Sequence, residues 1–166
     1  MSPLFADFDL EAQATRQMLA AVPWEHADWK PHEKSMSLGA LALHVASLPT
    51  MAVQTMTTDG LDLATPRPPR PEITSTDDLV AMWDEKTAEV RALLEDASEA
   101  DLEADWSLAM GGKTLSTDPR HVVVRRWMLS HIAHHRGQLS VYLRLLDAFV
   151  PGTYGPSADD RRLPGE

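Results

Sequence analysis

Three histidines within five residues form the chemically most suggestive part of the chain. His131, His134 and His135 lie in the segment Ser-His-Ile-Ala-His-His-Arg-Gly-Gln, residues 130–138, inside an expected long amphipathic helix. Because residues four apart lie one turn apart on the same helix face, the rings of His131 and His135 can reach one metal ion. Helical zinc-protease motifs use the same spacing. The pair therefore predicts a metal site built on a helix.

A third ligand has to come from elsewhere in the fold, because two imidazoles alone make a poor metal site. His44 is the best candidate, since it lies in the apolar run Leu-Ala-Leu-His-Val-Ala, residues 41–46. The chain has no cysteine, which excludes thiolate ligands, disulfides and cysteine nucleophiles. Any metal site must therefore use nitrogen and oxygen ligands. The alternative is that the inward histidines are hydrogen-bonded core residues.

The last expected helix carries an inward stripe at 100° per residue, and the two histidines point where its bulky aromatic residues point. The stripe comprises Val124, Trp127, His131, His135, Gln138, Tyr142 and Phe149. His134 fits it less well and is interpreted as a flanking residue, whereas Gln138 is placed to orient a ligand imidazole. The other histidines are expected to be exposed and solvated: His26, His32 and His121.

Helical periodicity runs through four segments: residues 4–22, residues 35 or 37 to beyond Met51, residues 75–97 and residues 118–149. Ser75 precedes acidic first-turn residues, as expected of an N-cap. Asp118 and Pro119 suggest an N-cap followed by proline at the first helical position. Pro49 predicts a kink or a break in the second helix. Together the segments predict an all-α four-helix bundle, in which sites are built from inward-facing side chains.

The connecting segments differ in character. Residues 65–71, Thr-Pro-Arg-Pro-Pro-Arg-Pro, are interpreted as a stiff polyproline-like crossover between the second and third helices, rather than as a ligand for a proline-recognition domain. Residues 106–116 contain Gly111 and Gly112 and predict a hairpin or an irregular loop. We expect the bundle to occupy residues 1–155 and a solvated tail to occupy residues 156–166.

Composition narrows the function classes. The 166 residues are 43% hydrophobic, as expected of one domain with a sizeable core. With 25 acidic against 15 basic residues, the formal charge of −10 argues against nucleic acid as a partner. The sequence has no run of 18 apolar residues, so it predicts no membrane span, and the amino terminus does not resemble a secretory signal. The sequence therefore predicts a soluble cytoplasmic protein without a membrane or nucleic-acid partner.

The segment His-x-x-x-His-Arg-Gly-Gln at residues 131–138, with Leu-x-His-Val-Ala around His44, resembles the DinB/YfiT-like family of metal-dependent proteins. Residues 34–39 and 151–156 also resemble the family, whose shared name with a lesion-bypass polymerase is coincidental. The resemblance implies an up-down-down-up four-helix bundle that is often dimeric. It also implies a divalent ion, nickel or zinc, held by His44, His131 and His135.

Relatives of this family include thiol-dependent S-transferases and a maleylpyruvate isomerase that uses a small thiol. The resemblance thus implies metal-activated attack by a small thiol on an electrophile, in a transferase or a related hydrolase. None of the 25 carboxylates is singled out as a general base, so the catalytic residues stay unassigned. A non-catalytic metal- or ligand-binding bundle with a stress-related role is one alternative, and a structural dimer with vestigial histidines is another. Five tryptophans exceed the need of one small core and favour a homodimer: Trp24, Trp29, Trp83, Trp106 and Trp127.

Overall fold

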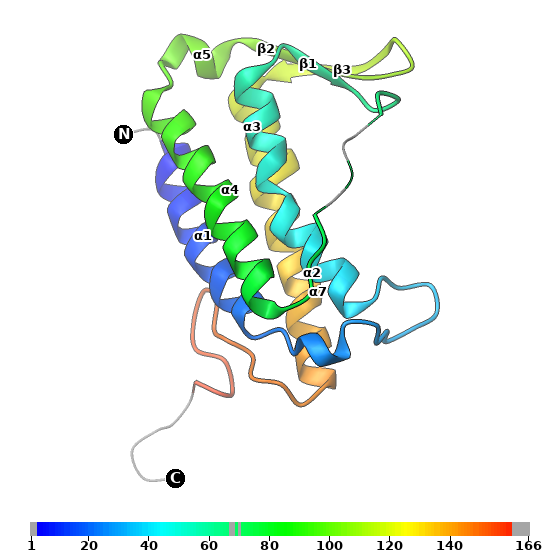
Figure 1. Cartoon of the computed structure of the whole chain (residues 1–166). Helices are drawn as coiled ribbons and strands as arrows, with labels where there is room; N and C mark the ends of the chain where they lie inside the picture. Colours follow the sequence, from blue (N-terminus) through cyan, green and yellow to red (C-terminus); the bar gives the residue numbers. More distant parts are fainter. Residues whose placement is uncertain (1–2, 67–68, 70, 161–166) are drawn as a thin grey trace.

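The computed structural model describes residues 3–66, 69 and 71–160 (Figure 1). Helices dominate the described residues. The longer helices are α1 (Pro3–Ala20), α2 (Leu38–Ser47), α3 (Pro49–Thr57), α4 (Thr76–Asp96) and α7 (His131–Leu145). The shorter ones are the 3₁₀ turn η1 (Trp24–His26), α5 (Glu99–Glu103), α6 (Arg120–Val124) and the π-helical segment η2 (Arg125–Ser130).

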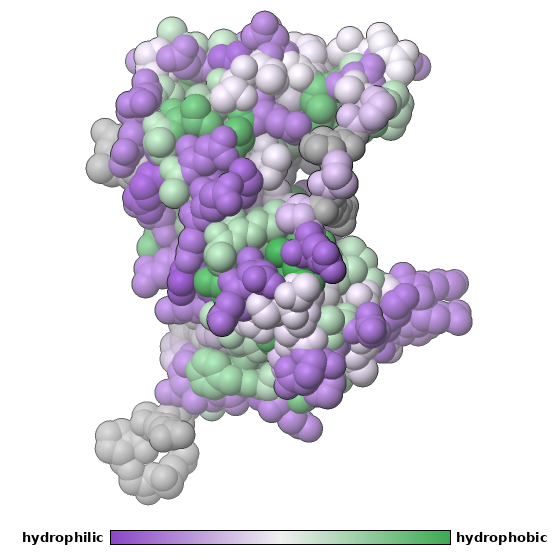
Figure 2. All heavy atoms as spheres, in the orientation of Figure 1, coloured by the Kyte–Doolittle hydropathy of each residue, from purple (hydrophilic) through white to green (hydrophobic). Residues whose placement is uncertain are grey.

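The long helices pack around one shared core. α1 contacts α4 and α7, α4 also contacts α2 and α3, and α2 contacts α7. The side chains facing this core are almost entirely apolar, as burial of one face of each helix requires. The largest of them include Phe8, Met18, Leu41, Leu79, Trp83, Met128, Ile132 and Leu139. Hydrophilic side chains cover much of the outer face of α4 (Figure 2).

Local sequence signals set where the central helices begin and bend. The Ser37 hydroxyl caps α2 by accepting from the Ala40 amide at 3.2 Å, and the Ser75 hydroxyl caps α4 by accepting from Asp78 at 3.1 Å. Pro49 opens α3 directly after Leu48, which keeps helical backbone angles. The predicted N-cap at Ser75 is therefore confirmed, and of the two alternatives at Pro49 the structure shows the break.

A small sheet lies at one end of the helices (Figure 1), so the expectation of an all-α fold is wrong in this respect. β2 (Asp105–Met110) and β3 (Lys113–Pro119) form an antiparallel hairpin, and β1 (Gly60–Asp62) pairs parallel with β2. Gly111 and Gly112 form its turn with φ of 59° and 78°, a region that favours glycine. The hairpin alternative for residues 106–116 is thus confirmed. The sheet packs Trp106 and Leu108 against Val123 of α6.

The last helical run starts later, ends earlier and is less regular than the periodicity predicts. β3 extends through Pro119, and α7 ends at Leu145. Residues of a π-helical turn are rotated less per residue than in an α-helix, so positions before η2 lose phase with those after it. The inward stripe is consequently wrong at Trp127, which is 36% exposed. It is also wrong at Phe149, which lies beyond the helix and is 54% exposed.

The segment after α7 folds back onto that helix as far as it is described. Asp159 accepts from both Arg144 Nη1 and Nη2, at 3.1 and 2.8 Å, and from the amide of Val150. Asp160 accepts from the amides of Gly152 and Ser157. These contacts anchor the first part of the expected tail, whereas residues 161–166 lie outside the described residues, as do Arg67, Pro68 and Arg70 of the proline-rich crossover.

Leu38–Thr57, which spans α2 and α3, is the one described helix that is long and apolar enough to cross a membrane by length and composition. The sequence-based search missed it because polar residues such as His44 and Gln54 interrupt its apolar run. Half of the apolar stretch is buried inside the fold. It packs against α4 and α7, so it has the character of a core helix.

Candidate metal centre

Two helices bring the three predicted ligand residues together. α2 carries His44 and α7 carries both His131 and His135, and these helices pack against each other. One ring nitrogen from each residue lies within 4.8 Å of the other two. The Nε2 atom of His131 is 3.4 Å from that of His44 and 2.9 Å from that of His135. The three rings therefore converge, as the spacing of His131 and His135 and the position of His44 predicted.

The local helix geometry explains the convergence. His131 and His135 start α7 one turn apart, so both rings project from the same face with their centroids 4.7 Å apart. On α2, Leu41 and Val45 are fully buried on either side of His44, which fixes the rotation of that helix. Each of the three histidines is itself half-buried. The site is thus held by core packing but still lies close to solvent.

A hydrogen bond to Gln138 sets the tautomer of His135. Nδ1 of His135 lies 2.7 Å from Oε1 of Gln138, and an amide oxygen can only accept, so this nitrogen carries the proton. In the neutral ring, Nε2 of His135 then carries a lone pair. This lone pair lies 2.9 Å from Nε2 of His131, where it can accept a proton from that ring or share a cation with it.

Burial favours the ligating form of His131. The pKa of His131 is lowered mainly by desolvation, and the nearby imidazoles of His135 and His134 lower it further. The hydrogen bond to Trp127 opposes these effects and is outweighed by them. A metal ligand must be the neutral imidazole. The environment therefore holds His131 in the state that a divalent ion needs.

The donor set fits a tetrahedral divalent ion. Zinc–nitrogen bonds of about 2.1 Å at tetrahedral angles place ligand nitrogens ~3.4 Å apart. The separation between Nε2 of His44 and of His131 is 3.4 Å, and the separation across the α7 pair is 2.9 Å, slightly shorter. All three donors are imidazole nitrogens, which suit zinc and nickel. No carboxylate belongs to the group among the described residues.

The other sequence-predicted residues agree with the structure in part. Gln138 contacts a candidate ligand as predicted, but it is exposed and not inward-facing. His26 and His32 are exposed as predicted. The prediction that His121 is solvated is wrong, because the residue is half-buried and its Nδ1 lies 3.1 Å from the carbonyl oxygen of Leu102. The reason is the short helix α5, which the sequence reasoning missed and which brings Leu102 beside α6.

Arg136 is a buried charge that the sequence reasoning did not single out. Its side chain lies on a different face of α7 from the histidines, 2% of the residue is exposed, and it pairs with Glu11 of α1 at 2.7 Å. It also donates to Thr15 at 2.9 Å and to the Tyr154 hydroxyl at 2.7 Å. Its position directly after His135 could have indicated that Arg136 faces another part of the fold, because neighbouring helix residues face different sides. Arg136 therefore ties α7 to α1 and to the C-terminal segment.

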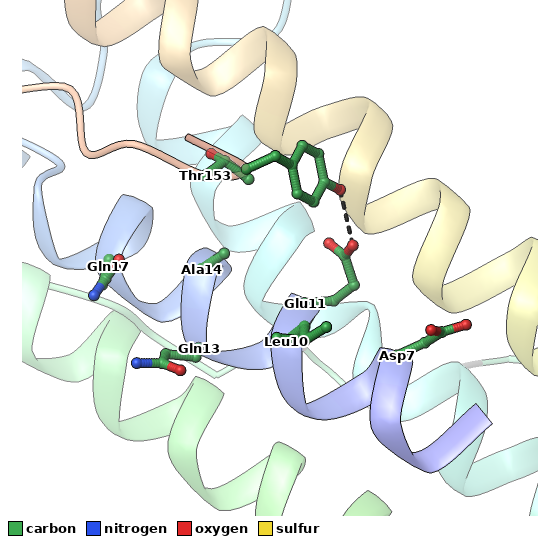
Figure 3. A pocket seen from close by; sticks show the side chains of 8 residues that line it. Asp7, Leu10, Glu11, Gln13, Ala14, Gln17 and Thr153 are labelled. Atoms are coloured by element: carbon green, nitrogen blue, oxygen red, sulfur yellow. Dashed lines mark hydrogen bonds between the residues drawn. The ribbon is translucent and has the colours of Figure 1, made fainter. Parts of the chain in front are cut away.

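A groove of about 440 Å³ lies beside this ion-pair network, over α1 (Figure 3). Its lining includes Asp7, Glu11 and Thr153, and the dashed line marks the hydrogen bond that Glu11 accepts at 2.8 Å from the tyrosine next to Thr153. None of the three clustered histidines lines it. The groove and the candidate metal centre are thus separate features of the molecule.

Comparisons with known proteins agree with this fold. The model of the DinB family matches residues 1–164. A DinB-like protein from Bacillus subtilis superimposes with a TM-score of 0.73 at 20% identity, covering 94% of this chain and 100% of that one. A DinB-like protein from Bacillus cereus gives 0.68 at 24% identity, covering 91% and 95%. A proposed DinB family member from Exiguobacterium sibiricum gives 0.62 at 21% identity, covering 96% and 98%. No curated protein matches the chain.

Proposed function

Because the chain belongs to the DinB family and brings three imidazole nitrogens together, we propose that it is a divalent metal-dependent enzyme. In this proposal His44, His131 and His135 hold nickel or zinc, and a small thiol attacks an electrophilic substrate at the site. The observation that carries the proposal is the convergence of these nitrogens, with the Nε2 atoms of the α7 pair 2.9 Å apart.

The shape of the ligand set supports a catalytic role over a structural one. Three protein ligands leave a tetrahedral ion with a position for another molecule, whereas structural sites are closed by four protein ligands. A bound ion of this kind lowers the pKa of a thiol or hydroxyl that reaches it. The chain supplies the groups that would hold the ion: Gln138 orients the ring of His135, and burial lowers the pKa of His131, which favours its neutral form. A thiol that reached such an ion would release its proton to solvent, so no carboxylate base would be required.

We extend the proposal to the assembly. The helices are proposed to form the up-down-down-up bundle that the resemblance implies, with the bundle occupying residues 1–155 and the tail occupying residues 156–166. The protein is further proposed to work as a homodimer in the cytoplasm. The pairing of long neighbouring helices around one core supports the bundle.

The function is tested by assaying thiol transfer with protein loaded with zinc or nickel. A panel of small thiols, including cysteine and glutathione, is combined with a fluorogenic alkylating electrophile. We expect turnover above the uncatalysed rate for at least one thiol, and its loss in His135→Ala. The matched control is His32→Ala, since His32 is exposed and lies outside the two helices that carry the cluster.

The alternative function, a non-catalytic metal- or ligand-binding bundle, predicts a different pattern. It predicts tight binding of one ion per chain without thiol turnover for any electrophile tested. The vestigial alternative predicts no ion binding above that of His135→Ala. Metal binding and turnover measured on the same preparation therefore separate the three readings.

A further inference from the structure

The side-chain amide of Gln138 lies between two imidazoles of α7. Its oxygen Oε1 is 2.7 Å from Nδ1 of His135, and its nitrogen Nε2 is 3.2 Å from Nε2 of His134. His134 and His135 also contact each other, with ring centroids 4.8 Å apart. His134 and Gln138 are both exposed, whereas His135 reaches into the candidate metal centre. The amide therefore links a surface imidazole to a candidate ligand.

The two ends of an amide are not equivalent, and this sets the direction of both hydrogen bonds. The Gln138 nitrogen can only donate, so Nε2 of His134 must accept. The Gln138 oxygen can only accept, so Nδ1 of His135 must donate. His135 then has no proton on Nε2 and presents a lone pair to the centre. Turning the amide over would reverse both bonds and would leave the proton of a neutral His135 on Nε2, where it blocks a metal.

We propose that His134 is a positioning residue that holds the Gln138 amide in its metal-compatible orientation. By accepting from the amide nitrogen, His134 keeps the amide oxygen on His135 and so keeps the His135 proton on Nδ1. The effect on metal affinity rests on the proposed metal-dependent function, whereas the effect on the His135 tautomer does not. Groups that orient ligating histidines in this way commonly change metal affinity ~10–100-fold when removed.

The exposure of this pair is what makes His134 necessary. A buried amide is oriented by the packed groups around it, but Gln138 is exposed and its described hydrogen-bond partners are the two imidazoles. Because His135 can adopt either tautomer, its bond alone does not choose the orientation of the amide. His134 in its Nδ1-protonated tautomer supplies an acceptor at Nε2, and an acceptor at this position fits only the amide orientation that keeps the His135 proton on Nδ1.

The experiment replaces His134 by residues that can only accept or only donate. ¹⁵N NMR of the imidazoles reports the His135 tautomer in the metal-free protein at about pH 8, where imidazoles are neutral. We expect the proton on Nδ1 in the wild type and in His134→Glu, whose carboxylate accepts from the amide nitrogen. We expect it to move to Nε2 in His134→Lys, whose ammonium donates to the amide oxygen and turns the amide over.

Zinc binding by calorimetry is the second readout, and we expect it to weaken at least tenfold in His134→Lys and to be preserved in His134→Glu. The variant Gln138→Glu controls for the effect of the lysine charge. In this background both carboxylate oxygens accept, so no donor of residue 138 can face His135. There, His134→Lys should leave the tautomer unchanged. A His135 proton that stays on Nδ1 in the single variant His134→Lys would overturn the proposal. A wild type that binds no zinc would overturn the proposed function, while the tautomer would still decide the role of His134.

Discussion

The Nε2 atoms of His131 and His135 lie 2.9 Å apart, and Nδ1 of His135 is engaged by Oε1 of Gln138 at 2.7 Å. His44 adds a third Nε2 atom, 3.4 Å from that of His131. Nitrogens around one tetrahedral zinc ion lie ~3.4 Å apart, so the fold holds these three groups close to the spacing that a shared cation needs.

Added zinc or nickel should raise the melting temperature at neutral pH. An ion at 100 times its dissociation constant stabilises the folded state by ~2.7 kcal/mol, which corresponds to about 5–10 °C for a domain of this size. Because protons compete for imidazole, the shift should shrink strongly at about pH 5. His131→Ala should lose most of it. Equal shifts at both pH values, unchanged in this variant, would mean that the ion binds elsewhere.

The metal-free protein should lose stability on acidification through His131. Its pKa is lowered in the fold, chiefly by burial and next by the charge of His135, whereas in the unfolded chain it titrates near pH ~6.5. Between the two pKa values the unfolded chain binds more protons, so this contribution is full above pH ~6.5 and is lost as the pH falls through the folded pKa. Urea unfolding of wild type and His131→Gln at about pH 7.5 and 5 measures the difference, with His32→Gln as the control. An identical loss in His131→Gln would contradict the prediction.

Removing one partner of the buried pair Arg136–Glu11 should destabilise the fold strongly. Glu11 keeps its charge beside α7 in Arg136→Met, so we expect a loss of about 3–5 kcal/mol in the free energy of unfolding. The double variant Arg136→Met/Glu11→Leu should recover much of this loss, because no charge is left buried without a partner. Denaturant unfolding of the two variants measures both values. A double variant that is less stable than Arg136→Met would show that the pair itself stabilises the protein.

Tyr154 should contribute less to stability than Arg136. It is exposed over most of its surface, yet its hydroxyl accepts from Arg136 and donates to Glu11, and desolvation raises its pKa. Tyr154→Phe removes only the hydroxyl, so we expect a loss of about 1–2 kcal/mol in the free energy of unfolding. Zinc affinity should not change, because this network joins α7 to α1 and to the C-terminal segment, whereas His44 belongs to α2. A change in zinc affinity would show that the network and the histidine cluster are coupled.

Most of the tryptophans pack inside the chain, so they give the predicted homodimer little support. Trp83 and Trp106 are buried in the cores of this chain, and Trp29 packs edge-on against Tyr142. Trp127 is the tryptophan left substantially exposed. Light scattering at micromolar concentration should give about twice the chain mass of 18.4 kDa. A mass of one chain would contradict the dimer without touching the proposed metal site.

Most of the features that could be predicted from the sequence depend on regular helical spacing. The i, i+4 pair His131 and His135 lies in the regular part of α7, so the face shared by its rings follows from periodicity alone. His44 could be chosen because few polar residues interrupt the apolar run of α2. The N-cap at Ser75 and the helix start at Pro49 could be predicted because they depend on local backbone chemistry and not on the rest of the fold.

The features that could not be predicted depend on contacts distant in sequence or on irregular backbone. β1 has three residues and gains its strand character from pairing with β2, 47 positions later at the Gly60–Ser107 pair. Nothing in the local pattern marks the π-helical segment η2, which misplaced Trp127 in the inward stripe. The burial of Arg136 needs Glu11 from α1 at the other end of the chain. The direction of the Gln138 amide needs the positions of both of its imidazole partners.

The most direct test of the three-histidine centre is a calorimetric zinc titration of the metal-free protein near pH 7.5. It compares the wild type with His44→Ala and with the control His32→Ala. His44 is the informative residue, because it joins the α7 pair from a different helix. We predict one ion per chain for the wild type and for His32→Ala, and at least a hundredfold weaker binding for His44→Ala. Wild-type affinity and stoichiometry in His44→Ala would contradict a site built from these three residues.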